Sequence, residues 1–75
     1  MDTIISILNI LPYKIIDKNK ISYYLNISKC YKGYIVRYWN FEDKIIIKQQ
    51  DNKLVNALKK AGEAITILTE QGEIA

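Results

Sequence analysis

The chain of 75 residues contains no histidine and a single cysteine, Cys30. Without histidine it lacks the usual general base, the commonest metal ligand and any triad of the Ser–His or Cys–His type. One cysteine makes neither an internal disulfide nor a structural zinc site. Three scattered glycines form no phosphate-binding loop. We therefore expect a protein without enzymatic activity, metal or cofactor.

Cys30 is the one candidate nucleophile, because Lys29 and Lys32 would favour its thiolate form. The alternative, which we favour, is an ordinary thiol at the end of a strand that behaves as a small apolar side chain. Glu42 and Asp43 are adjacent carboxylates, but a turn explains the pair, which gives no separated acid and base.

Long apolar runs are also absent, since no segment approaches the ~20 residues that a membrane-spanning helix needs. Residues 4–11 are apolar enough to resemble the short core of a signal peptide, but no basic leader precedes them and no small-residue cleavage site follows them. We expect a cytoplasmic protein without membrane contact. We also expect one domain over residues 1–75, because a chain of this length supports a single core.

Isoleucine, lysine, asparagine and tyrosine together make up about half of the chain. All four have A/T-rich codons, so the gene fits a low-GC bacterium or its phage. The net charge is +3, and residues 13–48 carry eight basic residues against three acidic ones. This basic region favours an acidic partner, either a protein surface or nucleic acid. The alternative is a solvated basic face whose lysines protect edge strands from aggregation.

Residues 21–49 predict three antiparallel strands, with loops at Lys32 and Gly33 and at Glu42 and Asp43. Glycine suits the first loop because it tolerates a positive φ. The first loop would place Tyr31 opposite Tyr34, Ile27 opposite Tyr38 and Asn26 opposite Trp39. The second loop would place Tyr38 opposite Ile47, Trp39 opposite Ile46 and Arg37 opposite Lys48.

Because side chains alternate along a strand, these registers sort the sheet into two faces. Face one, the predicted core face, is mostly apolar: Ile21, Tyr23, Leu25, Ile27, Lys29, Tyr31, Tyr34, Val36, Tyr38, Asn40, Ile45, Ile47 and Gln49. Face two mixes aromatic residues with cations: Ser22, Tyr24, Asn26, Ser28, Cys30, Ile35, Arg37, Trp39, Phe41, Lys44, Ile46 and Lys48. One helical layer covers one face of a small sheet, so we expect face two to stay open.

The candidate partner-binding residues all belong to face two: Tyr24, Arg37, Trp39, Phe41, Lys44, Ile46 and Lys48. Tyr, Trp and Arg dominate the binding energy of protein interfaces, and an exposed apolar patch marks an interaction site. The alternative is that the first helix covers part of face two, since apolar patches are more often buried than displayed.

Residues 1–11 are predicted to form a short helix that Asp2 or Thr3 caps and Pro12 ends, although their isoleucines also suit a strand. Residues 13–16 are either a short fourth strand at the sheet edge or a loop. A longer helix follows Asp51, the predicted N-cap.

The longer helix has one apolar stripe at spacings of 4, 3, 4 and 3, formed by Leu54, Leu58, Ala61, Ile65 and Leu68. Gly62 offers an alternative in which the helix ends at Ala61 and residues 64–69 form a last strand. We favour the continuous helix. In either case the element ends at Gln71 and Gly72, and residues 73–75 are expected to fray.

Together these elements predict an α+β fold: a three-stranded antiparallel meander with an optional fourth strand, packed by a long C-terminal helix and preceded by a short helix. The order resembles that of double-stranded-RNA-binding domains, as an analogy of architecture alone. Here the last helix follows Asp51, Asn52 and Lys53 rather than a lysine-rich segment, and the histidine-bearing loop of those domains is missing.

Two functions fit this sequence. The first is a protein-binding module that occupies a partner's acidic site, with Tyr24, Arg37, Trp39 and Phe41 as anchors. A small protein of this composition, without catalytic residues, fits a phage or mobile-element inhibitor of a host defence enzyme, a class that includes anti-CRISPR proteins. The second is single-stranded nucleic-acid binding, in which the aromatic residues stack on bases and the cations meet phosphates.

A second copy of the chain is a further candidate partner, because the edge of a small sheet can pair across a two-fold axis. The strand with Tyr24 and Asn26 is the more suitable edge. The outer strand carries Lys44 and Lys48, which resist pairing. A homodimer is compatible with either function.

Overall fold

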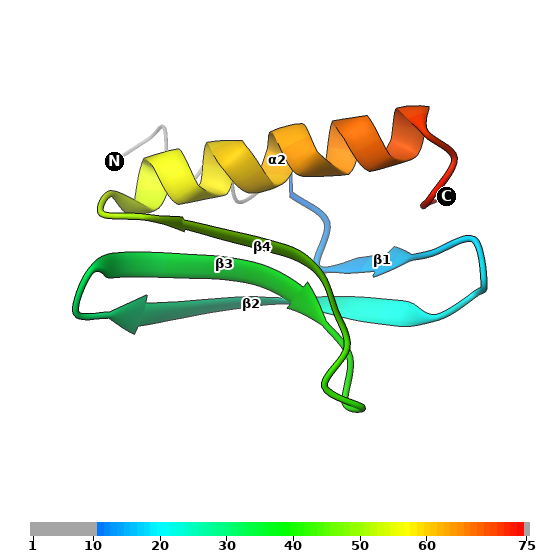
Figure 1. Cartoon of the computed structure of the whole chain (residues 1–75), viewed down its shortest axis with the longest axis horizontal. Helices are drawn as coiled ribbons and strands as arrows, with labels where there is room; N and C mark the ends of the chain where they lie inside the picture. The colour runs from blue at the N-terminus through cyan, green and yellow to red at the C-terminus, as the bar shows by residue number, and fades with distance from the viewer. Residues whose placement is uncertain (1–10, 75) are drawn as a thin grey trace.

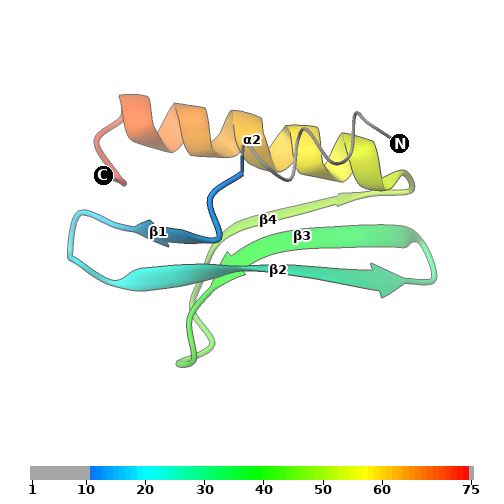
Figure 2. The same cartoon turned by 180° about the vertical axis from the view of Figure 1, so that it is seen from behind.

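A computed structural model of the chain describes residues 11–74. Four antiparallel strands, in the spatial order β1-β2-β3-β4, form one curled sheet, and a single helix lies across one of its faces (Figures 1 and 2). The elements are β1 (Lys14–Ile16), β2 (Ser22–Cys30), β3 (Gly33–Trp39), β4 (Ile45–Asp51) and α2 (Leu54–Glu70). The α+β fold with a C-terminal helix is therefore confirmed. The predicted first helix falls almost entirely on residues outside the described range.

The optional fourth strand is present at the edge of the sheet. Lys14–Ile16 pairs with β2, with Ile15 opposite Tyr23. Asp17 orders the turn that follows, because one of its carboxylate oxygens accepts the backbone N–H groups of Asn19 and Ile21, each at 2.8 Å. An Asx-type turn of this kind allows the reversal without glycine, and Lys20 adopts a left-handed φ of 66° there.

The predicted pairing of β2 with β3 is wrong by two residues. The two-residue loop consists of Tyr31 and Lys32, so Cys30 faces Gly33 and Ile27 faces Val36. Gly33 has a φ of +128°, and a Cβ there would collide with the backbone of Asp51 and Asn52. The glycine therefore serves the close approach of the β4–α2 connection rather than a position inside the loop. A shift of two residues preserves the face of every side chain.

The pairing of β3 with β4 agrees with the prediction for Tyr38 opposite Ile47 and for Arg37 opposite Lys48. Trp39, however, faces Ile45 across a β-bulge. As a result Ile46 packs against the core, whereas Ile45 is 46% exposed. The assignments of Ile46 to face two and of Ile45 to face one are therefore wrong.

The loop before β4 explains the bulge. It holds three residues, 41–43, closed by the bond from the Asn40 N–H to the Lys44 carbonyl at 3.0 Å. The Asn40 side-chain oxygen accepts the N–H groups of Glu42 and Lys44, and Asp43 adopts a left-handed φ of 62°. A loop one residue longer than predicted shifts the strand, and the extra residue of the bulge restores the register.

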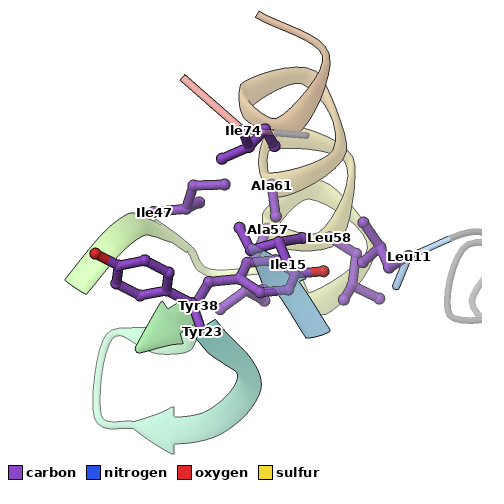
Figure 3. Packing of buried hydrophobic residues seen from close by; sticks show 10 residues of the cluster. Leu11, Ile15, Tyr23, Tyr38, Ile47, Ala57, Leu58, Ala61 and Ile74 are labelled. Atoms are coloured by element: carbon purple, nitrogen blue, oxygen red, sulfur yellow. The ribbon is translucent and has the colours of Figure 1, made fainter. Parts of the chain in front are cut away.

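The core lies between face one and α2. Val36, Tyr38, Ala57, Leu58 and Ala61 are fully buried there. Figure 3 shows Tyr38 and Ile47 from the sheet beside Ala57, Leu58 and Ala61 from the helix. The remaining core residues close the ends of this layer: Leu11, Ile15, Tyr23 and Ile74. Face one is thus confirmed as the core face, although Tyr31 belongs to the loop and is 92% exposed.

Helix α2 runs without interruption through Gly62, so the continuous helix is confirmed and the alternative strand is wrong. The predicted N-cap is also wrong, because Lys53 occupies that position and makes no side-chain cap bond. Asp51 instead accepts the Lys53 N–H at 2.9 Å and the Lys60 ammonium at 2.9 Å. The hydrogen bond from Lys53, followed by that from Lys60, lowers the pKa of the Asp51 carboxyl.

The C-terminal end is ordered by a Schellman motif rather than frayed at Glu73 and Ile74. The Glu73 N–H donates to the Leu68 carbonyl, and the Gly72 N–H donates to the Thr69 carbonyl. Gly72 adopts a left-handed φ of 74°. The chain then returns to the turn after β1, where Ile74 bridges to Asp17 and is buried. Lys18 and Glu73 add an exposed ion pair at 3.2 Å.

Candidate functional site

Helix α2 lies on one side of the sheet (Figure 2), and the core residues of face one pack against it, so face two is the opposite side. The observed registers place its residues in adjacent rows across the strands. Tyr24 on β2 faces Trp39 on β3, and Asn26 faces Arg37 in the next row. Arg37 in turn faces Lys48 on β4. Over residues 11–74 the helix and the core cluster pack on face one, and no described element is layered on face two.

Three aromatic side chains meet on this face. The ring of Phe41 lies 5.7 Å from that of Tyr24 and 6.3 Å from that of Trp39, with interplanar angles of 40° and 55°. These are the tilted arrangements that aromatic pairs prefer. Phe41 stands at the start of the loop after β3 and is 85% exposed, whereas Tyr24 and Trp39 are half-buried. The three rings form a continuous apolar surface with Phe41 at its outer end.

Arg37 adjoins the aromatic residues and is fixed from two directions. Its Nε donates to the side-chain oxygen of Asn26 at 3.0 Å. Its guanidinium carbon lies 5.6 Å from the centre of the Trp39 ring, within the range of a cation–π interaction. Among the described residues no carboxylate lies within ion-pair distance of it. The two terminal nitrogens of the guanidinium remain suited to a bidentate bond with a carboxylate or phosphate.

Two lysines flank Arg37 and the aromatic residues. Lys48 stands opposite Arg37, Lys14 stands opposite Tyr24, and both are exposed. No strand position on face two within the described range is acidic, and the nearest acidic residues in sequence are Glu42 and Asp43 in the loop after Phe41. The strands of face two are therefore positively charged, which favours an acidic ligand, while Glu42 and Asp43 place negative charge beside Phe41.

The structure brings together five of the seven predicted partner-binding residues: Tyr24, Arg37, Trp39, Phe41 and Lys48. Lys44 lies at the end of the loop before β4 and is exposed, and Ile46 contributes to the core instead. Sequence reasoning placed Asn26 on face two but missed its bond to Arg37. It also missed Lys14 and Ile45. Pairing β2 with β3 two residues away from the predicted register would have set Asn26 opposite Arg37. Assigning residues 14–16 to a strand would have set Lys14 opposite Tyr24.

We define the aromatic–arginine cluster as Tyr24, Asn26, Arg37, Trp39 and Phe41. Cys30, the other residue of chemical interest, lies at the end of β2, where its sulfur accepts the Gln50 side-chain N–H at 3.7 Å. Residues 11–74 contain no group of carboxylates and thiols arranged to hold a metal ion. No helix in that range is long and apolar enough to cross a membrane.

Comparison of the chain with protein-family models, curated proteins and solved structures finds no match in any of the three.

Proposed function

We propose that the protein is a non-enzymatic binding module that recognises another protein through the aromatic–arginine cluster. The observation that carries this proposal is the orientation of Arg37 by Asn26 and Trp39, beside the exposed ring of Phe41. A guanidinium fixed before binding loses little conformational freedom when a partner arrives. Arg, Trp and Tyr are also the residue types that carry most of the free energy at measured interfaces.

The partner's surface is expected to be acidic. Arg37 has no carboxylate partner within residues 11–74, and Lys14 and Lys48 extend the positive charge to both sides of it. A Glu or Asp side chain would meet both terminal nitrogens of Arg37, while an adjacent apolar side chain packed on Phe41 and Tyr24. Charge complementarity of this kind accelerates encounter and selects partners.

We propose further that binding inhibits the partner, and that the partner is a host defence enzyme opposed by a phage or mobile element. The support is the small size of the chain, its abundance of residues that A/T-rich codons specify, and its lack of histidine. Such a protein would act by occupying an acidic or substrate-binding surface of the enzyme.

Single-stranded nucleic acid is the alternative ligand, favoured by the exposure of Phe41 and by the pairing of Arg37 with Lys48 on the same side of the sheet. Bases stack on an open aromatic face. In this cluster Arg37 lies over the Trp39 ring and the rings are tilted on one another, so Phe41 offers the most open face. This geometry suits side-chain packing better than a run of stacked bases.

A pull-down from lysate of a low-GC bacterium tests the choice of ligand. Tagged protein is used with and without nuclease, beside Trp39→Ala and the control Tyr31→Ala, which removes an exposed aromatic outside the cluster. Protein binding predicts a discrete band that survives nuclease, persists with Tyr31→Ala and disappears with Trp39→Ala. Recovery of nucleic acid that is lost at high salt would replace this proposal with the alternative.

A further inference from the structure

One half of β2 has an edge to which β1 does not extend. Strand β1 pairs with β2 over Ser22–Tyr24, and the last bond along this edge runs from the Leu25 N–H to the Tyr13 carbonyl at 2.9 Å. The segment before β1 runs toward α2 (Figure 2), and its residue Leu11 is buried in the core. β2 itself continues to Cys30.

The backbone groups on this open half point outward at alternate residues. The Leu25 N–H bonds to Tyr13 on the outer side, so the N–H and C=O groups of Ile27 and Lys29 face the same side. Those of Asn26, Ser28 and Cys30 face β3, because Cys30 and Gly33 flank a two-residue loop. Within residues 11–74, Ile27 and Lys29 have no partner strand on the outer side.

We propose that a second copy of this chain pairs with the open half of β2, antiparallel about a two-fold axis at Ser28. In this register Ser28 faces Ser28 of the partner subunit, and Ile27 faces Lys29 of the partner subunit. Ile27 and Lys29 of each copy then exchange about four backbone hydrogen bonds with the other. The result is one continuous sheet of eight strands.

Three features favour a second copy over another occupant. The open segment runs from Asn26 to Cys30 and is centred on Ser28. Strand β2 of each copy would therefore end where the β1 strand of the other copy begins. The register sets no like charges directly opposite each other, which would be destabilising. Ile27, 38% exposed on face one, would also pack against the aliphatic part of Lys29 of the partner subunit.

The other edge of the sheet is less suitable. The outer strand β4 carries Lys48, and Lys44 precedes it, so pairing two such edges would bring lysines together. The β2 pairing also places face two of both copies on the same side of the continuous sheet. The dimer would therefore present two aromatic–arginine clusters on one surface, with both helices on the other.

Cross-strand cysteines test this register directly. In a Cys30→Ser background, Ser28→Cys places two thiols at a non-hydrogen-bonded pair on the two-fold axis, with Cβ atoms about 4.5–5.5 Å apart. Mild oxidation should convert most of this variant to a disulfide-linked dimer. Lys48→Cys in the same background is the matched control on the exposed outer strand, and it should form little disulfide-linked dimer.

The mass in solution gives an independent measurement. Light scattering on the natural chain should give twice the 8.7 kDa of one copy. Lys29→Pro removes an outward N–H that the described part of the chain does not use, so it should halve the mass while the circular dichroism spectrum is retained. A natural chain of one-copy mass at every concentration, or cross-linking through Lys48→Cys as efficient as through Ser28→Cys, overturns the proposal.

Discussion

Single residues show how closely the fold ties polar groups to the apolar core. Tyr38 is fully buried between the sheet and α2, yet its hydroxyl donates to the Pro12 carbonyl at 2.7 Å. This bond fixes the segment that leads into β1. On the opposite face the neighbouring Arg37 bonds to Asn26 in a comparable way. Adjacent residues of β3 thus serve stability on one face and the proposed recognition on the other.

The hydroxyl of Tyr38 is open to a direct test of stability. Tyr38→Phe should lower the free energy of unfolding by about 1 kcal/mol, because the part-buried hydrogen bond to the Pro12 carbonyl is lost. Urea denaturation followed by tryptophan fluorescence measures the change. Tyr31→Phe, which alters an exposed hydroxyl in the loop, should leave the denaturation midpoint where it is. Equal midpoints for Tyr38→Phe and the natural chain would show that the bond contributes nothing.

Tyr38 also predicts a dependence on alkaline pH. Burial raises the pKa of Tyr38 from 10.0 to about 12. Between these values the unfolded chain has lost the phenolic proton while the native state retains it, so the free energy of unfolding falls as pH rises through this window. The pKa of Tyr23, raised by burial and then by Asp17, acts with the same sign.

Chemical denaturation at about pH 8 and about pH 11 checks this dependence. The natural chain should lose stability at the higher pH, and Tyr38→Phe should lose less because one of the two phenols is gone. A Tyr38→Phe variant that loses as much stability as the natural chain would exclude Tyr38 as a source of the effect.

At the scale of the elements, much of the sheet could be predicted from the sequence. The alternation of side chains along residues 21–49 placed Tyr23, Val36, Tyr38 and Ile47 on the buried face. The apolar stripe of α2 was also correct, because its spacing allows one helical arrangement. Both predictions rest on a periodic pattern. A register error of two residues leaves each strand side chain on the same face, and the stripe of the helix does not depend on the loops.

Loop geometry was less accessible. Gly33 suggested a loop position, but its positive φ and lack of a Cβ serve the approach of Asp51 and Asn52. The Asn40 side chain closes a three-residue loop that the adjacent Glu42 and Asp43 did not indicate. The bond between Arg37 and Asn26 depends on the observed register, so that part of the candidate site could not be predicted.

Substitution by alanine should have opposite effects on stability at Gly62 and at Gly33. A Cβ at Gly62 would lie 3.7 Å from Leu11, an ordinary contact, so Gly62→Ala should stabilise the protein by about 0.5–1 kcal/mol through helix propensity. Gly33→Ala should destabilise it, because the φ of +128° and the backbone of Asp51 both oppose a side chain. Thermal denaturation compares the two. A destabilised Gly62→Ala would contradict the packing described for Leu11 and α2.

At the scale of the whole molecule, the sheet separates stability from the proposed recognition. Face one and α2 contain the core, while face two carries the aromatic–arginine cluster and the lysines beside it. Substitutions on face two should therefore change binding with little effect on folding. Pairing of β2 edges would double the number of clusters on one surface and so increase avidity for a partner with repeated sites.

The affinity of the captured partner protein for matched variants tests the central claim most directly. Trp39→Ala removes the aromatic support of Arg37, and Ile67→Ala removes an exposed apolar side chain on α2 as the control. If face two is the binding surface, titration calorimetry should show affinity reduced about 30-fold or more by Trp39→Ala, the ~2 kcal/mol of an interface hot spot, and unchanged by Ile67→Ala. Equal affinities for Trp39→Ala and the natural chain, both folded by circular dichroism, would contradict the account.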